Sequence, residues 1–121
     1  QLEQVFMNLL VNAYQAIEAR LARDGGGNGE IVLRTASTDG GVVISVSDDG
    51  AGIAPEHADR IFEPFFTTKE VGEGTGLGLS TSFEIVRRHG GTIRALPREG
   101  GGTTFEVWLP QQGPDGRAPH S

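Results

Sequence analysis

The stretch VVISVSDDGAGI, residues 42–53, decides the fold class of this chain of 121 residues. Val42, Ile44 and Val46 recur at every second position, which is the period of a β-strand with one buried face. The strand leads directly into DDGAG at residues 48–52. Glycines two positions apart let the backbone take positive φ angles and approach a ligand where any Cβ would clash. The stretch therefore predicts a strand that ends either in a ligand-binding loop or in a surface turn rich in Asp and Gly.

Patterned segments on both sides of this stretch complete the fold class. Upstream we expect a helix over residues 2–22, a strand over residues 30–36 with Ile31 and Leu33 on one face, and a hairpin turn at residues 39–41. Downstream we expect, in order, a short helix over 54–62, an irregular segment over 63–77, a helix over 77–88 with Leu79, Phe83 and Val86 on its buried side, and strands over 92–96 and 103–109. This order predicts an α/β (α+β) two-layer sandwich, with helices packed on one face of a mixed, mostly antiparallel sheet.

The composition limits the number of domains and the possible partners. A chain of this length forms one core but not two, so we expect one domain over residues 1–110 and a disordered polar tail over residues 111–121. A net charge of −6 disfavours binding to nucleic acid or to anionic membranes. Without cysteine there is no disulfide framework. Residues 1–6 read as the interior of a helix without a preceding cap, so we expect the chain to be an N-terminally truncated part of a longer protein.

The first predicted helix carries two asparagines on one face. Asn8 and Asn12 are four residues apart, and such residues are neighbours on a helix surface. Asparagine inside a helix costs about 0.7 kcal/mol relative to alanine, so the pair requires a reason. A side-chain amide oxygen can coordinate magnesium, which takes a few protein oxygens and completes its shell with water and phosphate. The alternative is two polar residues at the edge of a buried face, and the helix alone favours that alternative.

A glycine-rich turn, GEGTGLGLS at residues 72–80, opens the later helix. Free N–H groups and the helix dipole make such a turn an anion-binding site. It is not a Walker A loop, because no Gly-Lys-Ser/Thr follows, and no strand leads into it as a dinucleotide fingerprint requires. Just before it, FEPFFTTK at residues 62–69 places three phenylalanines within five residues, which indicates an aromatic anchor or ordinary core packing. Lys69 lies where it could reach a terminal phosphate.

Taken together, in this order and spacing, these elements resemble the catalytic ATP-binding domain of sensor histidine kinases. That family lies in the superfamily of gyrase-type topoisomerases, heat-shock chaperone ATPases and mismatch-repair ATPases. The matching segments are NLLVNA at 8–13 (N box), DDGAGI at 48–53 (first glycine box), FEPFF at 62–66 (F box), GTGLGL at 74–79 (second glycine box) and GTTF at 102–105 (closing strand). The resemblance covers residue 1 to about residue 110 and implies a Bergerat-type fold with an ATP lid.

The resemblance implies a magnesium-ATP site. Asn12 would bind magnesium, and Asn8 would support the phosphates as a catalytic residue. Asp48 would accept a hydrogen bond from the adenine amino group, and Thr103 would reach the base through water. The remaining nucleotide-binding residues implied are Gly50, Gly52 and Ile53 at the base, and Gly74, Thr75, Gly76, Leu77, Gly78 and Leu79 at the phosphates and lid.

One position departs from the pattern of many histidine kinases. Gln15 stands where they carry Lys or Arg, three residues after the magnesium asparagine. Some nitrogen-regulatory-type kinases are similar there, and residues 67–74 resemble their compact lid. We therefore expect Lys69 to supply the missing phosphate cation and to act as a second catalytic residue.

The identity of residue 8 separates phosphoryl transfer from hydrolysis. ATPases of the superfamily usually place a glutamate there as the general base, and the amide of Asn8 cannot take a proton. The resemblance thus implies a protein-histidine kinase whose partners are a phosphoacceptor and dimerisation domain of the same protein and a response-regulator receiver domain. His57, His89 and His120 do not lie in the helical hairpin that carries the family's acceptor. The chain alone is expected to be monomeric, cytoplasmic and nearly inactive.

Three other functions stay open on the sequence. The first is an ATP-driven conformational switch of the gyrase or chaperone type, which glutamate at position 8 and a longer lid would favour. The second is an anti-sigma-type serine kinase, which lacks the F box in this form. The third is a nucleotide-responsive binding module without transfer activity.

Overall fold

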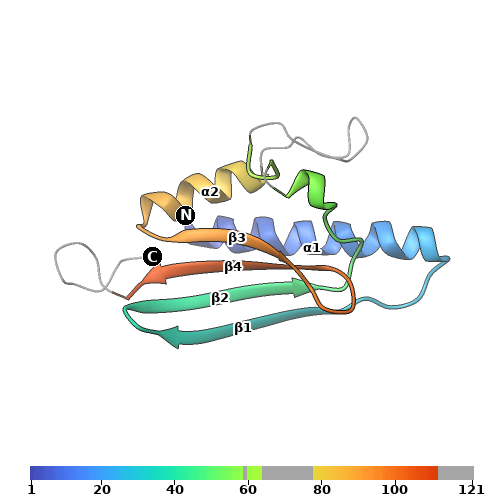
Figure 1. Ribbon diagram of the computed structural model, residues 1–121, viewed down its shortest axis with the longest axis horizontal. Coiled ribbons are helices and arrows are strands. Elements are labelled where there is room, and N and C mark those ends of the chain that lie inside the picture. The colour runs from blue at the N-terminus through green and yellow to red at the C-terminus, as the bar shows by residue number, and fades with distance from the viewer. Residues whose placement is uncertain (59, 64–77, 112–121) are drawn as a thin grey trace.

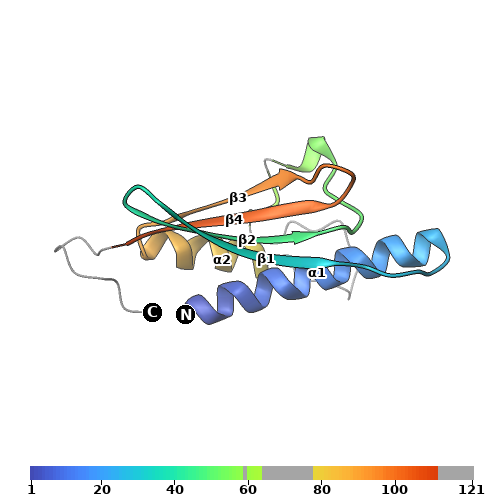
Figure 2. The same ribbon diagram turned by 90° about the horizontal axis from the view of Figure 1, so that it is seen from below.

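Two helices cover one face of a four-stranded sheet in the computed structural model (Figures 1 and 2). The structure describes residues 1–58, 60–63 and 78–111. The elements are, in order, α1 (Leu2–Asp24), β1 (Ile31–Thr38), β2 (Gly41–Asp48), the 3-10 turn η1 (Pro55–His57), α2 (Gly78–Arg88), β3 (Thr92–Pro97) and β4 (Thr103–Pro110). This is the predicted α/β two-layer sandwich. No helix in these residues is long and apolar enough to cross a bilayer.

The sheet has the order β1-β2-β4-β3, and each neighbouring pair is antiparallel. The prediction of a mixed sheet is therefore wrong for the described strands. β2 and β3 run in the same direction, but β4 lies between them and pairs with both. The position of β4 depends on contacts between distant segments, which no local pattern reveals.

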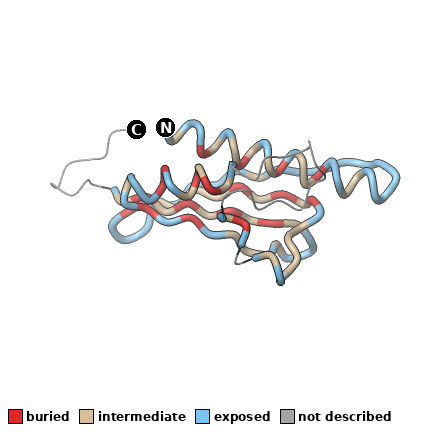
Figure 3. The backbone as a smooth tube through the Cα atoms, turned by 90° about the horizontal axis from the view of Figure 1, so that it is seen from above, coloured by how far each residue is buried: buried red, intermediate tan, exposed pale blue. Residues whose placement is uncertain are grey.

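The core lies between the sheet and α1 and α2, where the red buried positions face one another in Figure 3. Alternate residues of β4 point to the helices, and Phe105 and Val107 are fully buried. α1 contributes one residue per turn to this core: Val5, Leu9, Ala13 and Ile17. The spacing of four places these side chains on one stripe of the helix. Burial of this stripe against β2 and α2 positions the asparagine face of α1.

Ile31 and Leu33 share one face of β1, as predicted, but this face is only partly covered. Ile31 and Leu33 lie on the helix-facing side of β1, since Leu33 pairs with the buried Val46, yet they are 37% and 59% exposed. β1 is an edge strand, so its inward side chains reach past the helices. In α2, Val86 is fully buried as predicted, but Leu79 and Phe83 only partly, and Ile85 joins Val86 in the core.

The segment after β2 is less helical than expected. In place of a helix over 54–62, the structure has η1 followed by turns. The irregular segment predicted over 63–77 lies outside the described residues except for Glu63, and so does the tail from residue 112.

Candidate functional site

Asp48, the last residue of β2, is fully buried and only half satisfied. Its Oδ1 accepts a hydrogen bond of 2.8 Å from the backbone N–H of Gly50. Its Oδ2 is also buried and has no hydrogen-bond partner within the described residues. A buried carboxylate oxygen without a partner costs free energy that folding does not recover. The arrangement therefore suits a donor that comes from a bound molecule.

The surroundings of Asp48 act on its charge in opposite directions. Burial raises the pKa of Asp48, and the neighbouring Asp49 carboxylate adds to this effect. The hydrogen bond from the Gly50 N–H, the nearby N–H of Thr103 and the charge of Arg98 lower it. The effect of burial is the largest, so the pKa of Asp48 is raised and ionisation of this carboxyl group costs free energy in the folded chain.

Thr103 lies directly across the sheet from Asp48. The two residues are partners in the register of β2 and β4, and Thr103 is 4% exposed. The preceding Gly102 has φ 109°, and a Cβ on it would overlap the Asp48 carbonyl oxygen. The sheet thus brings together the two residues that the sequence proposed for the base, and Gly102 permits their close approach.

The loop after Asp48 is fastened to α1. A Cβ on Gly50 would lie 2.5 Å from the carbonyl carbon of Ala16, and the N–H of Ala51 donates to the Ala16 oxygen at 3.0 Å. Gly50 therefore makes room for the helix. The prediction of a positive φ is wrong for Gly50, whereas its approach to a ligand stays a prediction. Gly52 does have the positive φ, at 80°. The following Ile53 packs against the core.

The asparagine face of α1 runs from this loop to the start of α2. Asn12 precedes Ala16 by one turn and is partly exposed. One turn earlier, the Asn8 Nδ2 group donates to the Gly78 oxygen and to the Ser82 Oγ, both at 3.2 Å. Ser82 in turn donates to the Gly78 oxygen at 2.9 Å. Asn8 therefore joins α1 to the first turn of α2, where the glycine-rich sequence ends.

Ser82 was missed by sequence reasoning, although it is fully buried and polar. The available signal was its position four residues after Gly78, where a hydroxyl reaches the carbonyl of the preceding turn. This buried serine holds the beginning of α2 against Asn8.

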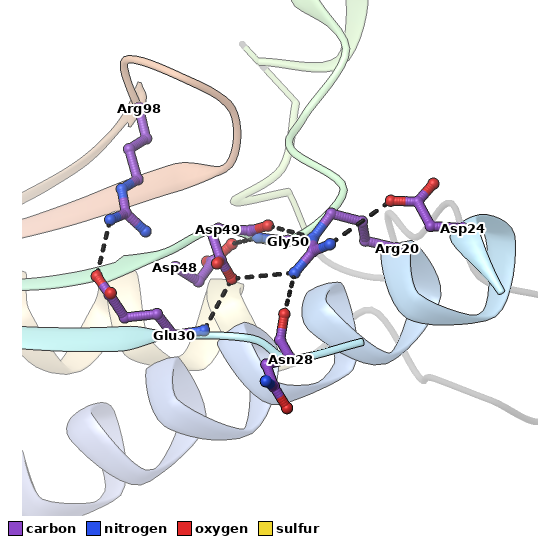
Figure 4. Close-up of polar contacts among 8 residues, drawn as sticks. All are labelled: Arg20, Asp24, Asn28, Glu30, Asp48, Asp49, Gly50 and Arg98. Atoms are coloured by element: carbon purple, nitrogen blue, oxygen red, sulfur yellow. Dashed lines mark hydrogen bonds and ion pairs between the residues drawn. The ribbon is translucent and has the colours of Figure 1, made fainter. Parts of the chain in front are cut away.

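An ionic network, also missed, braces the end of β2 (Figure 4). Arg20 of α1 donates from Nε to the Asp49 carbonyl oxygen at 2.6 Å and from Nη2 to the Asn28 oxygen at 2.7 Å. It also pairs with the Asp24 carboxylate at 3.5 Å. The N–H of Glu30 donates to Asp49 Oδ1 at 2.9 Å and lowers the pKa of Asp49, against desolvation and with help from the Arg20 charge. Asp49 is therefore a structural residue beside the candidate site.

The remaining predicted residues divide into two groups. Lys69, Gly74, Thr75, Gly76 and Leu77 lie outside the described residues, as do the second and third phenylalanines of the aromatic segment. The first, Phe62, packs against Phe83 at 5.6 Å and edge-on against Phe105 at 6.3 Å, measured between ring centroids. Core packing is therefore confirmed for Phe62, and its role as an aromatic anchor for the following loop stays a prediction.

An open hollow beside α2 lies apart from the Asp48 site. It is lined by Phe62, Glu63, Ser80, Thr81, Phe83, Glu84 and Arg88. None of these residues carries a buried polar atom without a partner among the described residues. The unpaired oxygen of Asp48 therefore remains the stronger indication of a ligand.

Comparison with known proteins gives one family. The family described as "Histidine kinase-, DNA gyrase B-, and HSP90-like ATPase" matches residues 1–113. Sensor histidine kinase ZraS of Escherichia coli (strain K12) is 48% identical over 110 residues, which are 91% of this chain and 22% of ZraS. The catalytic domain of histidine kinase ThkA has a TM-score of 0.70 and 41% identity, covering 88% of this chain and 64% of that one. Full-length ShkA in complex with AMPPNP has a TM-score of 0.72 and 31% identity, over 88% of this chain and 20% of ShkA.

Proposed function

Because the chain belongs to the histidine kinase-, DNA gyrase B- and HSP90-like ATPase family, as an ATP-binding catalytic domain of the sensor histidine kinase type, we propose that it holds magnesium-ATP and transfers the γ-phosphoryl group to a histidine of another domain. The chain spans about a fifth of the length of ZraS, and the activity of the whole protein is part of this proposal. The observation that carries it is the buried, unpaired Oδ2 of Asp48.

Asp48 is proposed to recognise the base. The exocyclic amino group of adenine is a hydrogen-bond donor and would satisfy Oδ2, whereas guanine presents an acceptor oxygen at the corresponding position. Thr103, across the sheet, is close enough to Asp48 to reach the same base through a water molecule. Gly52 and Ile53 continue the loop beside it. Pairing of a buried acceptor with the donor that it lacks discriminates strongly between bases, because the wrong base leaves the carboxylate unpaired.

The residues present fit a magnesium ion that arrives with the phosphates. Among residues 1–58, 60–63 and 78–111, no group of three or more His, Cys, Asp or Glu side chains could hold a metal by itself. Magnesium bound to a nucleotide needs few protein ligands, and the amide oxygen of Asn12 would provide one. Bound there, the ion would neutralise charge on the phosphates. α1 holds Asn12 at a fixed distance from the base loop, because Ala16 on the same face is bonded to Ala51.

Asn8 is proposed to support phosphoryl transfer by positioning. Its Nδ2 holds the first turn of α2. The N-terminal end of that helix would then face the nucleotide phosphates. The amide cannot act as a general base for water. An imidazole nitrogen of the acceptor would form a bond to the γ-phosphorus while the bond to the β–γ bridging oxygen breaks and ADP leaves. The residues proposed to surround the phosphates are Lys69, Gly74, Thr75, Gly76, Leu77, Gly78 and Leu79.

Transfer to a histidine-containing partner tests the proposal. The chain is mixed with γ-labelled ATP, magnesium and a helical-hairpin domain that carries a phosphoacceptor histidine. Acid-labile, base-stable label on the hairpin is expected, and the same hairpin with its histidine replaced should stay unlabelled. Free phosphate without labelled hairpin would instead indicate an ATPase. Nucleotide binding without either product would indicate a binding module, and both results would overturn the kinase proposal.

A further inference from the structure

Arg98, in the turn between β3 and β4, reaches toward the end of β2 (Figure 4). The turn is closed by the Arg98 N–H bonded to the Gly102 oxygen at 3.1 Å and by the Gly101 N–H bonded to the Arg98 oxygen at 3.0 Å. The side chain is 25% exposed, and its Nη2 pairs with Glu30 Oε1 at 3.0 Å. Its Nη1 is buried and has no hydrogen-bond partner within the described residues. One terminal nitrogen of the guanidinium, Nη2, therefore binds Glu30, whereas the other, Nη1, can still donate hydrogen bonds.

The charged groups around Asp48 come from four parts of the chain. Asp49 follows it directly, Glu30 precedes β1, Arg20 and its partner Asp24 come from α1, and Arg98 comes from the β3–β4 turn. Arg20 is occupied by the Asp49 carbonyl oxygen and the Asn28 carbonyl oxygen. The charge of Arg98 lowers the pKa of Asp48, against the larger effect of burial and the effect of Asp49. Pro97 and Asp48 both pair with Thr103, so Arg98 begins at the sheet edge where β2 ends. At this edge Asp48 Oδ2 and Arg98 Nη1, two groups of opposite charge, are each buried without a partner among the described residues.

We propose that Arg98 is a positioning residue that sets the preference for adenine over guanine nucleotides, by holding a positive charge beside the Asp48 carboxylate. This inference rests on the proposed role of Asp48 at the base. An ionised carboxylate only accepts hydrogen bonds, so it binds the amino group of adenine and repels the O6 oxygen of guanine. The neutral acid can donate to O6 and loses the discrimination. Burial favours the neutral acid, and Arg98 opposes it.

The test is the pH dependence of nucleotide selectivity in the 121-residue chain. ATP and GTP affinities are measured by calorimetry between about pH 5 and pH 8, at constant magnesium, and their ratio is plotted. Protonation of the phosphates affects both nucleotides alike and cancels in the ratio. In Arg98→Gln, the preference for ATP is expected to disappear at a higher pH than in the wild type. Arg98→Lys keeps a positive charge and should restore the wild-type profile, which a purely structural role would not predict.

A matched control is available on the other face of the sheet. Arg94 also pairs with a glutamate, Glu106, at 2.7 Å, and Arg94→Gln should leave the selectivity profile unchanged. Should Arg98→Gln fail to fold, Arg98→Met keeps the apolar stem and removes the same charge. Superimposable profiles of the neutral variant and the wild type would overturn the inference, as would a folded Arg98→Lys that behaves like Arg98→Gln. A wild type without ATP preference at any pH would instead refute the role of Asp48.

Discussion

Replacing Gly50 by alanine tests whether the loop after β2 needs a glycine to make room for α1 or to make room for a ligand. The structure places the backbone of Ala16 against Gly50, with the added Cβ 2.5 Å from the carbonyl carbon and 2.7 Å from the oxygen. Backbone atoms of a helix cannot rotate away, so either α1 or the loop must shift. Overpacking of this kind costs about 1–3 kcal/mol. The shift also strains the bond from the Ala51 N–H to the Ala16 oxygen, which is worth about 0.5–1.5 kcal/mol.

The expected loss for Gly50→Ala is therefore about 1.5–4.5 kcal/mol of unfolding free energy without nucleotide. This corresponds to roughly 5–20 °C in Tm for a domain of this size. Urea unfolding followed by circular dichroism measures the free energy, and calorimetry with ATP measures binding separately. Gly40→Ala is the control, because Gly40 has φ 77° and open space around its Cβ position. Its cost should be the left-handed strain alone, about 1–2 kcal/mol, with ATP affinity unchanged.

The refuting result is clear for this variant. If Gly50→Ala unfolds at the same urea concentration as the wild type but binds ATP more weakly, Gly50 makes room for a ligand and not for α1. The prediction from sequence, that Gly50 lets a ligand approach, would then be correct, and the contact with Ala16 would not contribute to stability.

Three further predictions concern the candidate site. Asp48→Asn should raise the unfolding free energy of the nucleotide-free chain at neutral pH, measured in urea, and should weaken ATP binding. Because burial raises the pKa of Asp48, this gain in stability should shrink as pH falls through that pKa. A gain that stays constant with pH would contradict the prediction. Asp49→Asn should lose about 1 kcal/mol at neutral pH, because the ion pair with Arg20 is removed and the bond from the Glu30 N–H no longer ends on a charged oxygen. The folded pKa of Asp49 is lowered, so in the same assay the loss should vanish only as pH falls through that pKa, and a loss that persists at lower pH would contradict it. Asn12→Ala should bind ATP more weakly than the wild type in the presence of magnesium, whereas in EDTA the two proteins should bind ATP with the same, lower affinity. If the variant is weakened equally in both buffers, Asn12 is not a magnesium ligand.

Much of the fold was predictable because its signals are local. The alternation of residues 42–47, the helical spacing in α1 and the glycines between segments depend on a few neighbouring residues. The bounds of β2 and β4 agree with the prediction to within one residue. The insertion of β4 between β2 and β3 and the exposure of Ile31 and Leu33 were not predictable, because both depend on which strand becomes the edge.

The sequence by itself determined which residue types could bind a nucleotide: the Asp48 carboxylate, the amides of Asn8 and Asn12, and a glycine-rich turn before α2. Only the tertiary structure decided that Asp48 is buried with one oxygen unpaired, that Thr103 faces it, and that Arg98 brings a cation to the same edge. The reason is physical. The chemistry of a side chain belongs to its own residue, whereas its desolvation and its neighbours depend on segments that meet only when the sheet forms.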